Sequence, residues 1–145
     1  MGYNMSNNYK KTSIETAGKL DLVIMCYEKA IQLLMQAKNH FEMNEIEKKA
    51  RKMQKALDIL NELQSCLNME KGGQIAKNLD AIYAYLTRRL LLGDIKKDLD
   101  AFNESIRILS ELKEAWDEIA HGGDDHIGVT ESPKYKGIDG ARIAA

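Results

Sequence analysis

Hydrophobic residues recur at steps of three and four along most of this chain, which is the spacing of an amphipathic α-helix with one buried face. In the clearest stretch, large apolar residues share one helical face: Leu79, Ile82, Tyr83, Leu86 and Leu90. The same period predicts helices over about 18–40, 44–67, 74–92 and 95–120. Because a single proline interrupts the 145 residues and few positions suit a β-hairpin, the pattern predicts an all-α protein.

The segments outside this period divide the chain into three parts. Residues 1–17 are mostly polar, and residues 122–145 contain five glycines and the only proline, Pro133. Amphipathic helices joined by short connections form an antiparallel up-down bundle. We therefore expect a four-helix bundle over residues 18–121, with a flexible N-terminal arm before it and a flexible C-terminal tail after it.

Local signals predict where the helices begin and end. Asn44 is a good N-cap for the second helix. The Gly72-Gly73 pair is typical of a helix end followed by a reversal of the chain. Gly93 is expected to end the third helix in the left-handed conformation, and Asp94 to cap the fourth.

The second helix has more apolar surface than contact with one core requires. Its heptad-like stripe consists of Ile46, Ala50, Met53, Leu57, Leu60 and Leu67, and a neighbouring strip consists of Ala56, Ile59, Leu63 and Cys66. At about 100° per residue the two strips span an arc of about 200°, whereas covering a core needs about 100°. Either a third neighbouring helix or a partner protein covers the excess apolar surface. On the third helix, Tyr85 is rotated away from the core stripe, where a tyrosine suits a partly wet surface.

Charge and composition exclude several classes of partner. The formal net charge is −1, and basic residues alternate with acidic ones, so we expect no nucleic-acid partner. No apolar run approaches the roughly 18 residues of a membrane span, so we expect no membrane insertion. Residues 1–12 lack an apolar signal segment, which favours a cytoplasmic protein, and Cys26 and Cys66 are then expected to be reduced.

The chain offers little catalytic chemistry. Its three histidines are His40, His121 and His126, all at or beyond predicted helix ends. Glu118 and His121 form one Glu-x-x-His motif, but a di-iron bundle site needs two such motifs and two further glutamates. Neither cysteine has a histidine or cationic neighbour in its pattern that would activate a thiolate. We therefore expect no enzyme activity, no cofactor and no metal site.

Several separate motifs indicate a family. They are Tyr9 followed by Ile14, Thr16 and Ala17; the run KALDILNEL at 55–63; Glu70-Lys71-Gly72-Gly73; Tyr83-x-Tyr85-x-x-Arg88-Arg89-Leu90; and Trp116. Together, over Tyr9 to Trp116, they resemble the flagellar secretion chaperone family FliS. The resemblance implies a cytoplasmic export chaperone that binds the C-terminal amphipathic segment of flagellin in apolar grooves. Such binding would prevent premature polymerisation and keep flagellin competent for flagellar type III secretion.

The resemblance and the apolar strips together predict the client-binding residues. They are Tyr9, Ile14, Tyr27, Ala56, Ile59, Leu63, Cys66, Tyr83, Tyr85 and Leu112. Tyr9 and Ile14 are expected to occupy part of the groove when no client is bound. Components of the flagellar export apparatus are expected as further partners, and the protein is expected to be a monomer or a weak homodimer. The alternative is a non-catalytic helical bundle whose extra strips serve dimerisation or signalling.

Overall fold

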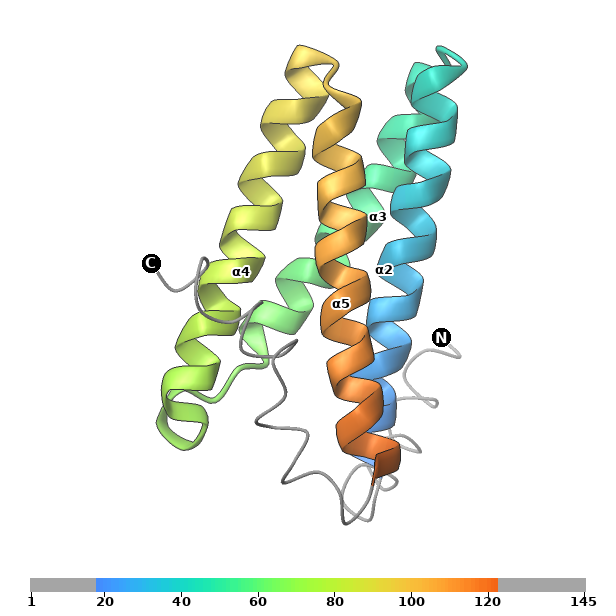
Figure 1. Cartoon of the computed structure of the whole chain (residues 1–145). Coiled ribbons are helices and arrows are strands. Elements are labelled where there is room, and N and C mark those ends of the chain that lie inside the picture. The colour runs from blue at the N-terminus through green and yellow to red at the C-terminus, as the bar shows by residue number, and fades with distance from the viewer. Residues whose placement is uncertain (1–17, 123–145) are drawn as a thin grey trace, which may run out of the picture.

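The computed structural model describes residues 18–122, which form four helices and no strand. The helices are α2 (Lys19–Glu42), α3 (Ile46–Ser65), α4 (Met69–Lys96) and α5 (Leu99–Gly122), as Figure 1 shows. The predicted all-α bundle is confirmed. The predicted arm, with Tyr9 and Ile14, and the predicted tail beyond Gly122 lie outside the described residues.

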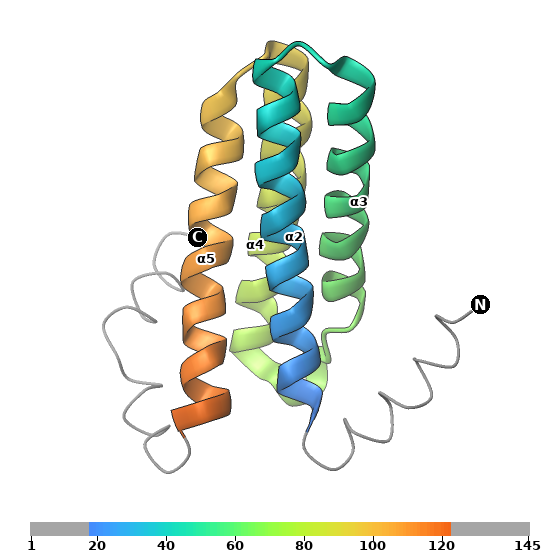
Figure 2. The same cartoon turned by 90° about the vertical axis from the view of Figure 1, so that its right-hand side faces the viewer.

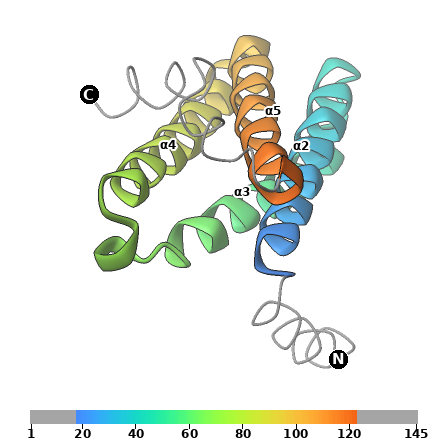
Figure 3. The ribbon, with the colours of Figure 1, turned by 60° about the horizontal axis from the view of Figure 1, so that its bottom comes forward.

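The four helices run alternately up and down and close into a ring. Helix α2 packs against α3 and α5, and α4 packs against the same two helices, so α2 and α4 face each other across the bundle. Figure 2 shows the α2–α3 and α4–α5 connections at one end of the molecule, and Figure 3 shows the ring from the opposite end. Short connections between antiparallel neighbours produce this order.

The core fills the space between the four helices. Its fully buried large side chains are Tyr27, Leu33, Leu34, Leu60, Ile82, Tyr83, Leu86, Leu90, Phe102 and Leu109. The predicted stripe of α4 is confirmed at all five of its positions from Leu79 to Leu90. Each fully buried leucine or isoleucine side chain stabilises the fold by about 1.5–3 kcal/mol.

The buried stripe of α3 is rotated from the predicted one. Its buried residues are Lys49, Met53, Ala56, Leu60 and Leu63. Ile46 and Ala50 were expected in the core but are exposed, so that prediction is wrong. Helix α3 packs against both α2 and α4, which turns the predicted second strip inward. Lys49 joins the stripe because its ammonium group pairs with Asp94 and lies 5.3 Å from the centre of the Phe41 ring.

The boundaries predicted at the first two connections are wrong. Asn44 is a turn residue with φ of 65° rather than an N-cap, and α3 begins after Glu45, whose carboxylate accepts a hydrogen bond of 2.7 Å from His40 Nδ1. The second reversal lies at Cys66–Asn68, before the glycine pair. There the side chain of Asn68 accepts a hydrogen bond of 2.9 Å from the amide of Lys71 and caps α4. Gly73, with φ of 53°, kinks the first turns of α4.

Gly93 does not end α4. The helix continues to Lys96, and Lys97 takes the left-handed conformation, with φ of 57°. Gly93 is buried because α4 and α5 approach closely there: a Cβ atom added to Gly93 would lie 2.3 Å from the Cβ atom of Ala101. Asp98, not Asp94, caps α5, accepting a hydrogen bond of 3.0 Å from the amide of Asp100.

Candidate functional site

A groove of about 590 Å³ runs between α2 and α3. It is lined by Met25, Cys26, Glu28, Lys29, Gln32, Asp58, Ile59 and Glu62. The apolar part consists of half-exposed Met25 and partly buried Cys26 and Ile59. Its charged side chains are three carboxylates and one ammonium group. The groove therefore combines apolar side chains with mainly acidic ones, a composition that suits an amphipathic helix.

The predicted apolar strip of α3 is divided between this groove and the core. Ile59 lines the groove, and Cys66 is exposed where α3 ends. Ala56 and Leu63 lie in the core, and Leu63 is only 8 % exposed. A charge placed at Leu63 would therefore disturb the fold as well as the groove, whereas a change at Ile59 tests the groove more directly.

Three other predicted client contacts lie in the interior of the described bundle. Tyr27, Tyr83 and Leu112 are buried, and the two tyrosine hydroxyls meet across the bundle at 2.6 Å. The ring of Trp116 lies 6.5 Å from that of Tyr27, between centroids. Burial raises the pKa of the Tyr27 phenol to about 12 and raises the pKa of Tyr83 further, so both remain neutral. In this conformation these side chains belong to the hydrophobic core, and their contact with a client stays a prediction.

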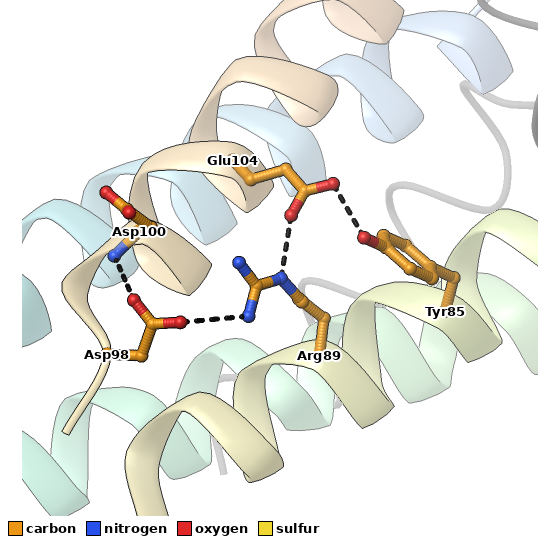
Figure 4. Close-up of polar contacts among 5 residues, drawn as sticks. All are labelled: Tyr85, Arg89, Asp98, Asp100 and Glu104. Carbon is orange, nitrogen blue, oxygen red and sulfur yellow. Dashed lines mark hydrogen bonds and ion pairs between the residues drawn. The ribbon is translucent and has the colours of Figure 1, made fainter. Parts of the chain in front are cut away.

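Tyr85 is half-buried and belongs to a polar network that joins α4 to α5. Its hydroxyl donates a hydrogen bond of 2.6 Å to Glu104, which also accepts one of 2.7 Å from Arg89. Arg89 reaches Asp98 as well, at 3.3 Å, so the network leads to the residue that caps α5 (Figure 4). The hydroxyl of Tyr85 faces Glu104 rather than a groove, so the role of Tyr85 in client binding remains a prediction.

The network also affects the titration of its members. Hydrogen bonding to Glu104 raises the pKa of Tyr85 and of Arg89. Partial burial raises the pKa of Glu104, but the hydrogen bonds from Tyr85 and Arg89 outweigh that effect and lower it overall. The paired charged state is therefore favoured near neutral pH.

Two further grooves of similar volume lie among the described residues. One, of about 530 Å³, lies between α3 and α4, where Leu57, Ala84 and Leu91 supply its apolar surface. The other, of about 570 Å³, lies between α2 and α5 and includes Ile31 and Met35. In the sequence, Met35 stands opposite the apolar stripe of the first helix, which was the available signal for a surface beyond the core.

The described residues contain neither a metal-ligand cluster nor a membrane-spanning helix. Within residues 18–122, no three histidine, cysteine, aspartate or glutamate side chains come together as a metal site. No helix in that range combines the length and the apolar character that crossing a membrane requires. The geometry of the site is therefore that of apolar grooves between the helices of a bundle.

Comparison with known proteins shows which family this chain is similar to. Residues 2–123 match the family model described as flagellar protein FliS. The flagellar secretion chaperone FliS of Vibrio cholerae is 38% identical over 115 residues, which are 77% of this chain and 85% of that protein. The corresponding chaperone of Salmonella typhimurium is 34% identical over 77% of this chain and 87% of its own length. The flagellar secretion chaperone FliSB of Pseudomonas aeruginosa is 32% identical over 78% of this chain and 93% of its own length.

Proposed function

This chain belongs to the flagellar protein FliS family, and on that basis we propose that it is a cytoplasmic secretion chaperone that binds the C-terminal amphipathic segment of flagellin. Its relatives are named as flagellar secretion chaperones and not as enzymes, in agreement with the expected absence of catalysis. A substrate of the flagellar export system is therefore the partner class that the family indicates. Flagellin as the substrate, and components of the export apparatus as later partners, are the specific proposals.

The α2–α3 groove is the observation that supports this function. An export substrate outside its filament has apolar stripes that lack their normal neighbours, and the helix-in-groove mode can cover them. Met25, Cys26 and Ile59 supply the apolar surface of this groove. Ordering the client costs about 2–5 kcal/mol of the gross interaction energy. Binding therefore requires an extended contact, which further grooves along the bundle would lengthen.

The segment before α2 has a role in the same proposal. Tyr9 and Ile14 are large apolar residues in a mostly polar stretch that precedes Gly18. We propose that they shield part of the α2–α3 groove until the client displaces them. Deleting residues 1–14 should leave the helical content unchanged and raise the affinity for the client. An unfolded truncation, or an unchanged affinity, would contradict this role.

Calorimetry with the C-terminal segment of flagellin tests the proposed function. The full chain should bind the segment, and Ile59→Asp should weaken binding at least tenfold, because the charge would face an apolar helix side. Ile46→Asp is the matched control: it places the same change on an exposed residue of α3, 13 positions and about 20 Å away. Circular dichroism would verify that both variants remain folded.

Three outcomes would count against the proposal. They are no binding by the full chain, equal binding by the Ile59→Asp variant, and equal weakening by both variants. The alternative function, dimerisation or signalling, predicts a stable dimer in sedimentation that the flagellin segment does not dissociate or join.

A further inference from the structure

The groove between α2 and α5 continues along most of the length of both helices. Its main section, of about 570 Å³, includes Ile31 and half-exposed Met35. A second section, of about 320 Å³, shares Met35 with the first and adds Ile106. Together the two sections extend along α2 from Glu28 to Glu42, which is about 21 Å of helix. Figure 2 shows α2 and α5 side by side, with the end of α5 near the start of α2.

Amide side chains supply much of the polar surface of this groove. The four that line it are Gln32, Gln36, Asn39 and Asn103. Within residues 18–122, none of these four side chains forms a hydrogen bond. Glu28 pairs with Lys113 at 3.6 Å, and Lys38 and Glu42 have opposite charges, so the groove has no net charge. Because an amide both donates and accepts hydrogen bonds, as the peptide backbone does, the groove suits an uncharged extended peptide.

The chain leaves α5 close to one end of this groove. Helix α5 ends at Gly122, which is nine positions and about 14 Å along the helix axis from Lys113. Gly122 and Gly123 form a glycine pair of the kind that reverses the chain after a helix. The family match stops at residue 123, so it does not extend to the segment that follows.

That following segment contains a short stretch of the chemistry that the groove suits. Residues 127–130 read Ile-Gly-Val-Thr and carry no charge. In an extended segment Ile127 and Val129 project to the same side, because side chains alternate with a period of two. Five residues span at most about 18 Å and seven at most about 25 Å, so both side chains can reach the groove after the chain turns back.

From these observations we infer that residues 127–130 of this chain occupy the α2–α5 groove as an extended segment antiparallel to α5. Ile127 and Val129 cover Ile31 and Met35, and the main chain between them bonds to the amide side chains. The direct link to α5 favours this occupant over a second copy, because a short linker gives an effective concentration in the millimolar range. The inference does not depend on the proposed function, but a client that extended into this groove would have to displace the segment.

The oxidation rate of Met35 in dilute hydrogen peroxide tests this inference in the full chain without any client. Peroxide converts the thioether to a sulfoxide, and mass spectrometry of peptides gives the rate at each methionine. Met43 is the internal control, since it is 61 % exposed, close to the 55 % of Met35, and lines neither section of the groove. The double variant Ile127→Asp, Val129→Asp should oxidise Met35 at least about threefold faster than the unmodified chain and leave Met43 unchanged. A threefold change corresponds to about two-thirds occupancy of the groove.

A second double variant, Ile138→Asp with Ile143→Asp, is the matched control, because it places the same charges later in the chain and should leave the Met35 rate unchanged. Circular dichroism would verify that both double variants remain folded. Equal Met35 rates in the unmodified chain and in the Ile127→Asp, Val129→Asp variant would overturn the inference. So would a Met35 rate that rises on deletion of residues 1–14 instead, because the occupant would then be the N-terminal segment. Protection of Met35 that increases with protein concentration would identify a contact between two copies and would also overturn it.

Discussion

Gly93→Ala is a sharp test of the packing between α4 and α5. The sequence pattern predicts a glycine that ends the helix in the left-handed conformation, and an alanine there would cost about 1 kcal/mol through backbone strain. In the structure Gly93 is helical, so backbone strain does not arise. The methyl group would instead collide with Ala101, because the two Cβ atoms would lie 2.3 Å apart.

The size of the effect follows from this distance. Carbon atoms in ordinary contact are about 3.5–4.0 Å apart, so the helices must separate locally by about 1.5 Å. Overpacking of this kind costs about 1–3 kcal/mol, and the severe overlap places the cost near the upper end. The higher helix propensity of alanine relative to glycine offsets about 1 kcal/mol of this cost. We expect a net loss of about 2 kcal/mol, which lowers the melting temperature by about 7–9 °C for a domain of this size.

Urea unfolding of a double-mutant cycle with Ala101→Gly measures the collision itself. Ala101→Gly removes the opposing methyl group, so the double variant should be more stable than Gly93→Ala by at least about 1 kcal/mol. The carbonyl oxygen of Asp98, 3.3 Å from the added Cβ, makes the rescue incomplete. Two results would contradict this explanation. One is that the stability losses of the two single variants simply add in the double variant, and the other is that Gly93→Asn is tolerated better than Gly93→Ala. Either would mean that close packing against Ala101 is not the reason for a glycine at position 93.

Four further substitutions test other parts of the structure. Tyr27→Phe and Tyr83→Phe should each destabilise by about 1–3 kcal/mol in chemical unfolding, because one buried hydroxyl loses its partner, while the double variant should lose less than the sum. Glu104→Gln tests the network with Arg89: since folding lowers the pKa of Glu104, its stabilisation is present at neutral pH and is lost as pH falls below the ordinary value of 4.5. The Gln variant should therefore be less stable at pH 7 and show a smaller loss on acidification, and identical pH profiles would contradict this. Lys97→Gly should raise the melting temperature, because Lys97 has φ of 57° and glycine adopts this conformation without strain; a lower value would count against the left-handed end of α4.

The Ile59, Tyr85 and Arg89 positions show how far the site could be predicted. The hydrophobic period predicts an apolar excess on the second helix, and Ile59 does line a groove. The period alone does not separate Ile59 from Leu63, because their exposure depends on how α3 is rotated between α2 and α4. Tyr85 was expected at a partly wet position and is half-buried, but its partner Glu104 is 19 residues away and on another helix. The pairing of Arg89 with Glu104 likewise arises only when α5 is in place.

The sequence by itself determined the helical class, the number of helices in the bundle and the buried face of α4, because these follow from local hydrophobic periodicity. It also contained the motifs that identify the family. Tertiary structure alone decided which apolar residues remain exposed, because that depends on the rotation and spacing of neighbouring helices. Gly93 is the clearest example. In the sequence it signals a helix end, but its place is explained by the methyl group of Ala101 on another helix, which no local pattern reveals.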